Sequence, residues 1–222
     1  MKRASYDPVF KCWDWQNAQY FCGPAATVDL PTGAFPTPAT GSSFYQRVGN
    51  RIIVTGFHWR SVILPSREND APAPDQYCRL MVVYDKQWNG RAVAPPIDEI
   101  LQIRQANGVA QIRPLGGTNV DWLDRFEVLM DEFYAVPQIA PYGASSTNDA
   151  YNVDLNGMRL EKCVEGLHLP ITFKGNTTSP SDVATGGLFL VSLSSHTIPP
   201  ALPTEKPAWI CIFDVRFHFQ DQ

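Results

Sequence analysis

Residues 79–90 read RLMVVYDKQWNG, in which an apolar run passes directly into a polar turn. A short apolar run that is bounded by turn residues is typical of a buried β-strand. Asn89 and Gly90 tolerate positive φ, so the run predicts a strand that ends in a tight turn. No enzyme motif requires this combination, and the turn therefore indicates the shape of a loop rather than a reaction.

Similar strand patterns recur along the chain, separated by turn dipeptides that contain glycine. The expected strands cover residues 51–64, 77–85, 125–136, 159–173, 187–194 and 208–219. In the first of them the apolar positions change parity between Val54 and Phe57, which predicts a bulge at Thr55–Gly56. In the last strand, alternate residues over 209–219 are apolar, so one of its faces belongs to the core.

Length and composition agree with an all-β protein. The 222 residues include 19 Pro and 15 Gly, and 12% of the residues are aromatic, which favours many short strands joined by turns. Residues 96–101 (PIDEIL) have apolar positions three and four apart and predict one short helix. We expect a single eight-stranded antiparallel jelly-roll sandwich with long loops. Residues 46–222 would form this domain, and residues 1–45 an N-terminal arm with little regular structure.

Three runs of sequence occur in the order that one known family shows: residues 46–54 (QRVGNRIIV), 84–90 (YDKQWNG) and 124–129 (DRFEVL). They resemble the coat proteins of small circular single-stranded DNA viruses that encode a replication initiator. These viruses are related to circoviruses and geminiviruses, and their coat proteins have a jelly roll like that of satellite tobacco necrosis virus. The resemblance extends over residues 42–219 and implies this fold, no enzymatic activity and no cofactor.

The resemblance implies a structural capsid protein that assembles with copies of itself into a small T=1 icosahedral shell around circular single-stranded DNA. Such a subunit is made in the host cell, is expected to assemble in the nucleus, and belongs to the virion, where it meets an unknown host receptor. No run of about eighteen apolar residues occurs, so we expect no membrane insertion.

Jelly rolls also serve as carbohydrate-binding, lectin-like modules, and this is the alternative function. Clustered aromatic residues and loop Asp and Asn residues would suit sugar recognition. The size of the purified species separates the two functions, because a coat protein forms particles and a lectin remains a monomer or small oligomer.

The charge balance is unusual for a protein that encloses nucleic acid. The chain has 18 basic and 22 acidic residues, a net charge of −4, and residues 1–40 hold three of each. The resembled family usually begins with a basic arm. The candidates for nucleic-acid binding are therefore individual basic side chains. For each of them a structural ion pair is the alternative role. Trp13 or Trp15 would stack on a base. These cations are Lys2, Arg3, Lys11, Arg47, Arg51, Arg60 and Arg216, together with Arg79 and Arg125 at similar strand positions.

The turn at residues 86–90 is the candidate contact surface. Trp88 occupies a position that is often small or proline in the resembled family, so we expect a large exposed ring at the loop tip. Exposed rings on shells meet a neighbouring subunit or a receptor. Trp88, Asn89 and Gly90 are therefore the predicted surface-loop residues.

Motifs for catalysis and metal binding do not stand out. The sequence contains no phosphate-binding loop, nucleophile elbow or zinc-protease helix. The four histidines, His58, His168, His196 and His218, are scattered, which disfavours a cupin-type metal enzyme. The carboxylate pairs Asp121/Asp124 and Asp131/Glu132 are best interpreted as solvated side chains of loops. A calcium ion between subunits would bind the same kind of oxygen atoms.

The five cysteines do not suggest a disulfide framework, and their odd number leaves at least one thiol free. Cys78, Cys163 and Cys211 lie in strand-like runs and are expected to be buried thiols. Cys12 and Cys22 flank an aromatic segment, and a bridge between them is the minority alternative.

Overall fold

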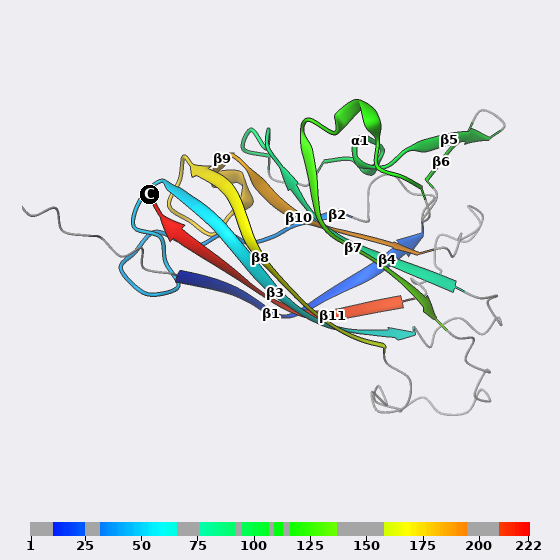
Figure 1. The fold of residues 1–222 in the computed structure, drawn as a ribbon, viewed down its shortest axis with the longest axis horizontal. Helices are drawn as coiled ribbons and strands as arrows, with labels where there is room; N and C mark the ends of the chain where they lie inside the picture. The colour runs from blue at the N-terminus through cyan, green and yellow to red at the C-terminus, as the bar shows by residue number, and fades with distance from the viewer. Residues whose placement is uncertain are drawn as a thin grey trace, which may run out of the picture.

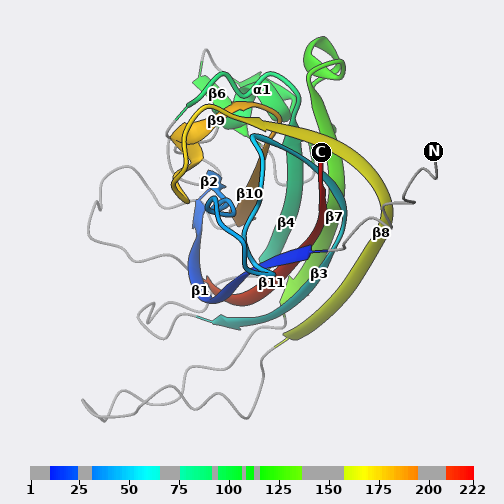
Figure 2. The same cartoon turned by 90° about the vertical axis from the view of Figure 1, so that its left-hand side faces the viewer.

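The computed structural model describes residues 11–24, 32–65, 76–91, 95–106, 109–112, 116–136, 158–194 and 209–222. Within these ranges the chain is built mainly of β-strands that curve around one apolar core (Figure 1, Figure 2). The first sheet contains, in spatial order, β1 (Lys11–Pro24), β11 (Trp209–Asp221), β3 (Arg51–Pro65) and β8 (Met158–Phe173). The second contains β2 (Thr32–Ala34), β10 (Gly187–Ser194), β4 (Gln76–Asp85) and β7 (Phe126–Val136).

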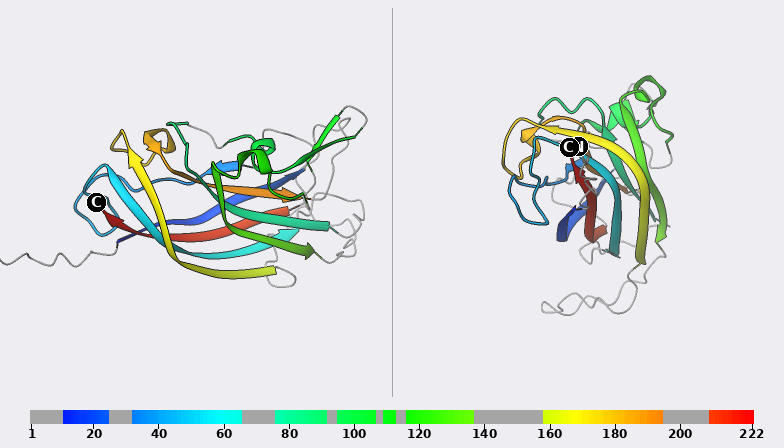
Figure 3. Two further views of the ribbon diagram at one scale, coloured as in Figure 1. Left: turned by 45° about the horizontal axis from the view of Figure 1, so that its top comes forward. Right: turned by 60° about the vertical axis from the view of Figure 1, so that its left-hand side comes forward.

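This strand order confirms the predicted jelly roll. Along the chain, β1 and β2, β3 and β4, β7 and β8, and β10 and β11 lie in opposite sheets (Figure 3). Neighbours within each sheet pair antiparallel. The end of β1 links the two sheets, because Gly23 and Pro24 pair in parallel with Leu193 and Ser194 of β10. Eight strands in two such sheets are the double-sheet arrangement of a jelly roll.

Shorter elements decorate this frame. The predicted short helix is α1 (Ile97–Ile100), and its two isoleucines are buried. A hairpin of β5 (Ile103–Ala106) and β6 (Val109–Ile112) follows it, and β9 (Val183–Thr185) pairs with the end of β8. Two 3-10 turns, η1 (Val120–Trp122) and η2 (Pro180–Asp182), precede β7 and β9. No helix in the described ranges is long and apolar enough to cross a membrane.

The predicted bulge in β3 is present. The register of β3 against β8 shifts between Val54 and Gly56, and the register of β11 against β3 shifts at the same level. One extra residue at this point lets both Val54 and Phe57 face the core, since each is fully buried. A Cβ atom at Gly56 would lie 2.5 Å from the carbonyl oxygen of Val164, so glycine is required where β8 approaches.

Aromatic rings fill the space between the sheets. On the inner face of β11, Phe213 stacks on Trp59 with 4.5 Å between ring centroids, and Phe217 stacks on Trp13 at 4.7 Å. Phe35, which follows β2, contacts both phenylalanines edge-on. Such pairs contribute about 0.5–1.5 kcal/mol each beyond the area they bury. Because Phe35 follows a strand of the second sheet, these contacts hold the two sheets together.

The N-terminal segment differs from the expected arm. Residues 1–45 were expected to have little regular structure, but Lys11–Pro24 forms β1, which pairs with β11 from Lys11 opposite Phe219 to Cys22 opposite Trp209. The physical reason is the alternation around Trp13: its ring enters the core, whereas Asp14 faces outward and pairs with Arg216. The expectation is therefore wrong over β1, which completes a sheet.

Candidate functional site

The turn after β4 folds inward and does not present its tryptophan to solvent. Trp88 is 1% exposed, and its indole Nε1 donates a hydrogen bond to the carbonyl oxygen of Pro180 at 3.0 Å. A Cβ atom at Gly187 would lie 2.2 Å from the Trp88 ring, so glycine there leaves room for the indole. The expected exposed ring is wrong, because η2 and β10 cover Trp88 from segments far along the chain.

The two residues after Trp88 have the predicted backbone. Asn89 has φ 54° and Gly90 has φ 67°, the left-handed conformation that a turn of this kind requires. Asn89 is exposed and Gly90 is half-buried beside Lys174. Of the three predicted surface-loop residues, only Asn89 is exposed.

The same turn begins with a buried ion-pair network. Asp85 is fully buried and accepts two hydrogen bonds from Arg125, from Nε at 2.9 Å and Nη2 at 2.8 Å. Arg125 Nη1 also donates to Glu99 at 2.7 Å, and the backbone N–H of Gln87 donates to Asp85 at 2.8 Å. The hydrogen bonds that Arg125 donates to Asp85 raise the pKa of Arg125, so this guanidinium stays charged. The network ties β4, α1 and β7 together.

Arg47 has a similar role in the loop before β3. Its guanidinium is buried and donates to the carbonyl oxygens of Pro38, Gly49 and Gly175, the first at 3.1 Å. It also lies over the ring of Phe173 at 4.0 Å from the centroid. Burial lowers the pKa of Arg47 from its usual value. The side chain therefore joins three loop segments and is closed to a phosphate.

A third buried arginine lies on β4. Arg79 donates to both carboxylate oxygens of Asp131, at 2.7 and 2.6 Å, and to the carbonyl oxygen of Gly116 at 2.6 Å. Glu132, which follows Asp131 in the sequence, accepts a hydrogen bond from Lys162 of β8 across the edge of the sandwich. These carboxylates hold cationic side chains rather than forming a metal site. Groups of three metal-ligand side chains do not occur in the described part of the chain.

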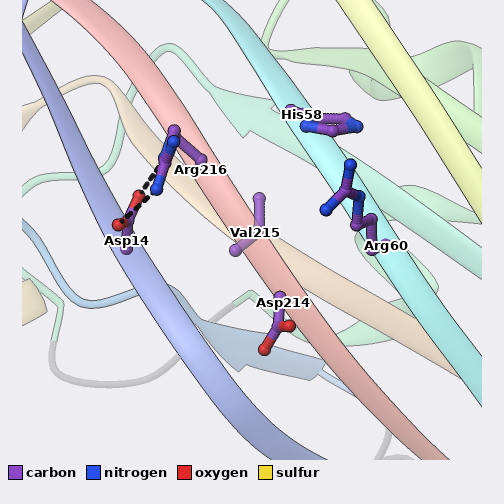
Figure 4. Close-up of a pocket in the computed structure, with 6 residues that line it drawn as sticks. All are labelled: Asp14, His58, Arg60, Asp214, Val215 and Arg216. Atoms are coloured by element: carbon purple, nitrogen blue, oxygen red, sulfur yellow. Dashed lines mark hydrogen bonds and ion pairs between the residues drawn. The ribbon is translucent and has the colours of Figure 1, made fainter.

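The outer face of β1, β11 and β3 carries a set of charged side chains around one pocket (Figure 4). Asp14 and Arg216 form a two-point ion pair, with oxygen–nitrogen distances of 2.7 and 3.1 Å. Beside them, Glu161 of β8 accepts from Arg60 Nε at 3.1 Å and contacts His58 Nε2 at 2.9 Å. A shallow pocket of about 150 Å³ lies between them, lined by Asp14, His58, Arg60, Asp214, Val215 and Arg216.

The electrostatics of this face come from cross-strand pairing. The hydrogen bonds from Arg60 and then from His58 lower the pKa of Glu161, which stays ionised. The hydrogen bonds that Arg216 donates to Asp14 raise the pKa of Arg216. Each arginine on the face already has a carboxylate partner. The face therefore suits contact with another mixed-charge protein surface better than contact with bare phosphates.

Of the predicted nucleic-acid-binding residues that the structure describes, two, Arg60 and Arg216, lie together on this outer face. Lys11 is buried between Asp221 at 2.8 Å and the carbonyl oxygen of Gln46 at 2.8 Å. Arg51 is exposed and makes no ion pair within the described ranges. Lys2 and Arg3 lie outside the described residues. Arg47, Arg79 and Arg125 are held in the buried contacts given above.

The two candidate base-stacking rings face the core. Trp13 is 5% exposed and donates from Nε1 to the carbonyl oxygen of Pro36 at 3.0 Å. Trp15 is half-buried against Phe35 and Phe213, with ring centroids 5.4 and 5.2 Å away. Trp13 and Trp15 are two residues apart, with the polar Asp14 between them, and this alternation indicates a strand with both rings on one face.

The thiols are distributed partly as expected. Cys12, Cys78 and Cys211 are buried and free of disulfides. Cys163 is exposed, which corrects the expected burial, because it lies on the outward face of β8 in the same register row as His58. The side chain of Cys22 and the whole of His196 lie outside the description.

Neither a family model nor a curated protein sequence matches the chain. Solved structures do align with it. A chain of the full particle of Israeli acute paralysis virus aligns at 8% identity over 97% of this chain and 68% of that one, with a TM-score of 0.29. VP1 of Trichodysplasia spinulosa-associated polyomavirus, solved in complex with 3'-sialyllactose, aligns at 10% identity over 98% and 96%, also with a TM-score of 0.29. The strand order described above defines the class of the molecule: an all-β, jelly-roll protein.

Proposed function

We propose that the chain is a structural capsid protein that self-assembles into a small T=1 icosahedral shell enclosing circular single-stranded DNA. Its partners would be copies of itself, the genome, and a host receptor. The protein would be made in the host cell, assemble in the nucleus and belong to the virion. In line with the family resemblance, the chain would act without catalysis or a cofactor.

The observation that carries the proposal is the position of the three runs that resemble the coat-protein family. Asp85 of the second run and Arg125 of the third pair with each other inside the sandwich, and Arg47 of the first run is buried against Phe173. The three runs therefore supply buried contacts that hold this jelly roll together. They have this structural role without forming a catalytic site. Fold alone does not define function, so the proposal rests on these residues.

The proposal is tested by the size of the purified protein. We expect closed shells in electron micrographs, and a particle far larger than the 24.8 kDa chain in sedimentation or light scattering. The lectin-like alternative predicts a monomer or small oligomer that binds an immobilised glycan. A species that stays monomeric across a range of salt and pH would overturn the capsid proposal.

We also expect assembly to proceed without nucleic acid. The net charge is −4, and the buried and outer-face cations described above are already paired or closed off, so few phosphates could be neutralised. Particles treated with nuclease should keep their sedimentation rate and have a protein-like ratio of absorbance at 260 and 280 nm. Bound nucleic acid should be released by moderate salt. Particles that collapse after nuclease, or that retain protected nucleic acid at high salt, would contradict this.

A further inference from the structure

Within the described ranges, large apolar side chains are exposed mainly in two places. The 44–51 patch contains Phe44, Tyr45 and Val48, which are 52, 56 and 65% exposed, together with the exposed Arg51. The 120–127 patch contains Val120, Trp122 and Leu123, which are 63, 40 and 52% exposed, with Asp121, Asp124 and Glu127 around them. Exposed rings and branched chains that gather in this way mark interaction surfaces.

The 120–127 patch is a fixed structure with a concave centre. The side chain of Asn119 accepts from the backbone of Asp121 at 3.1 Å and donates to the carbonyl oxygen of Asp98 at 2.9 Å, which fastens η1 to α1. Trp122 and Leu123 line an apolar pocket of about 290 Å³ whose inner wall includes Ile100, Phe126 and Val128. The pocket is therefore built before any partner arrives.

Acidic residues accompany this pocket: Glu127 lines it, and Asp121 and Asp124 are sequence neighbours of its lining residues Trp122 and Leu123. Asp121 and Asp124 are exposed, and within the described ranges neither makes an ion pair. Glu127 has only a distant partner, Lys86, at 3.9 Å. The pocket would therefore favour an apolar segment that carries a positive charge.

The 44–51 patch has this chemistry. The rings of Phe44 and Tyr45 meet edge-on at 5.5 Å. The loop is held by hydrogen bonds from Gln46 N to Ser43 O at 3.0 Å and from Val48 N to Asp221 Oδ1 at 3.0 Å. Arg51, at the end of the patch, makes no ion pair with any described residue. A held loop with two adjacent rings loses little conformational freedom when it docks.

The two patches do not contact each other within one molecule. In Figure 1 the loop before β3 lies at the end that holds the C-terminus, whereas η1 stands beside α1 above the start of β7. Figure 2 separates the same two segments in the perpendicular view. A contact between them must therefore join two copies of the chain.

We propose that the 44–51 patch of one subunit docks into the apolar pocket of the 120–127 patch of a neighbouring copy. The inference rests on the proposed function, since it describes one interface of the shell. The contact joins different surfaces of identical subunits, and repetition of such a contact closes into a ring when the rotation between neighbours allows. Phe44 and Tyr45 would enter beside Trp122, and Arg51 would face Glu127, which lines the pocket, and the exposed Asp121 and Asp124 next to it in sequence.

Single substitutions in either patch should weaken assembly and leave the fold intact. Trp122→Ser and Tyr45→Ser should each raise the protein concentration needed for particles by more than about tenfold, because buried aromatic rings dominate interfaces. Phe133→Ser is the matched control, since Phe133 is 44% exposed but lies outside both patches. Sedimentation measures assembly, and circular dichroism with thermal melting reports the subunit fold.

A charge exchange tests the pairing directly. Arg51→Glu and Asp124→Arg should each reduce assembly. The double variant should recover most of it, because each interface then again contains one positive and one negative side chain, with their positions exchanged. Variants that assemble like the wild type, or a double variant no better than either single one, would overturn this contact while the capsid function stands. A wild-type chain that never assembles would instead overturn the proposed function.

Discussion

Replacing Asp85 with alanine is expected to lower the free energy of unfolding by about 3 kcal/mol or more. The substitution removes both hydrogen bonds to Arg125 and leaves a guanidinium that is 7% exposed with Glu99 as its remaining partner. A buried charge that loses its partner typically costs about 3–5 kcal/mol. Urea unfolding followed by tryptophan fluorescence measures the change, with the denaturant dependence checked for constancy.

Two further variants make this result specific. Glu161→Ala removes a carboxylate of the surface ion pairs with Arg60 and His58 and should change stability little, because exposed pairs are weak. The double variant Asp85→Leu with Arg125→Met should be more stable than Asp85→Ala, since no unpaired cation remains. If Asp85→Ala unfolds at the same urea concentration as the wild type, the network does not hold the sandwich closed.

Replacing Trp88 with alanine should be comparably severe, with an expected loss of about 3–5 kcal/mol. The indole is 1% exposed, contacts Phe189 with 6.2 Å between centroids, and donates its N–H to Pro180. Its removal leaves a cavity between the turn, η2 and β10 and an unsatisfied carbonyl. Thermal melting of the purified subunit, under conditions that prevent assembly, measures the effect.

Trp122→Ala is the matched comparison, because it removes the same side chain from a site that is 40% exposed. We expect a small change in melting temperature for this variant. Equal destabilisation by the two substitutions would contradict the difference in burial between the two indoles. A large effect of Trp122→Ala alone would place that indole in the core.

The local elements were predictable because they depend on residues close together in the chain. The apolar run before Asp85 became β4, the three-and-four spacing near Ile97 became α1, and the parity change before Phe57 became a bulge. In each case the period of apolar residues states which side chains share a face. Strand positions and the jelly-roll class therefore followed from pattern and resemblance together.

The first strand was missed for a physical reason. Its alternation is short, it includes a register shift between Trp15 and Ala18, and it lies among prolines, glycines and threonines that favour irregular structure. What makes it a strand is the unpaired edge of β11, to which it adds antiparallel. That edge belongs to residues about 200 positions later in the chain. Asp14 and Arg216, which pair across the two strands, are 202 residues apart.

The sequence by itself determined β3, β4, β7, β8, β10 and β11, the turn after β4 and the short helix, because local periodicity and turn chemistry act over a few residues. Only the tertiary structure decided which polar and aromatic side chains are buried. Arg125 meets Asp85 from 40 residues away, and Trp88 meets Pro180 from 92 residues away. A charge or an indole is stable inside only where distant segments supply partners for its polar atoms. Those partners exist only once the two sheets have closed.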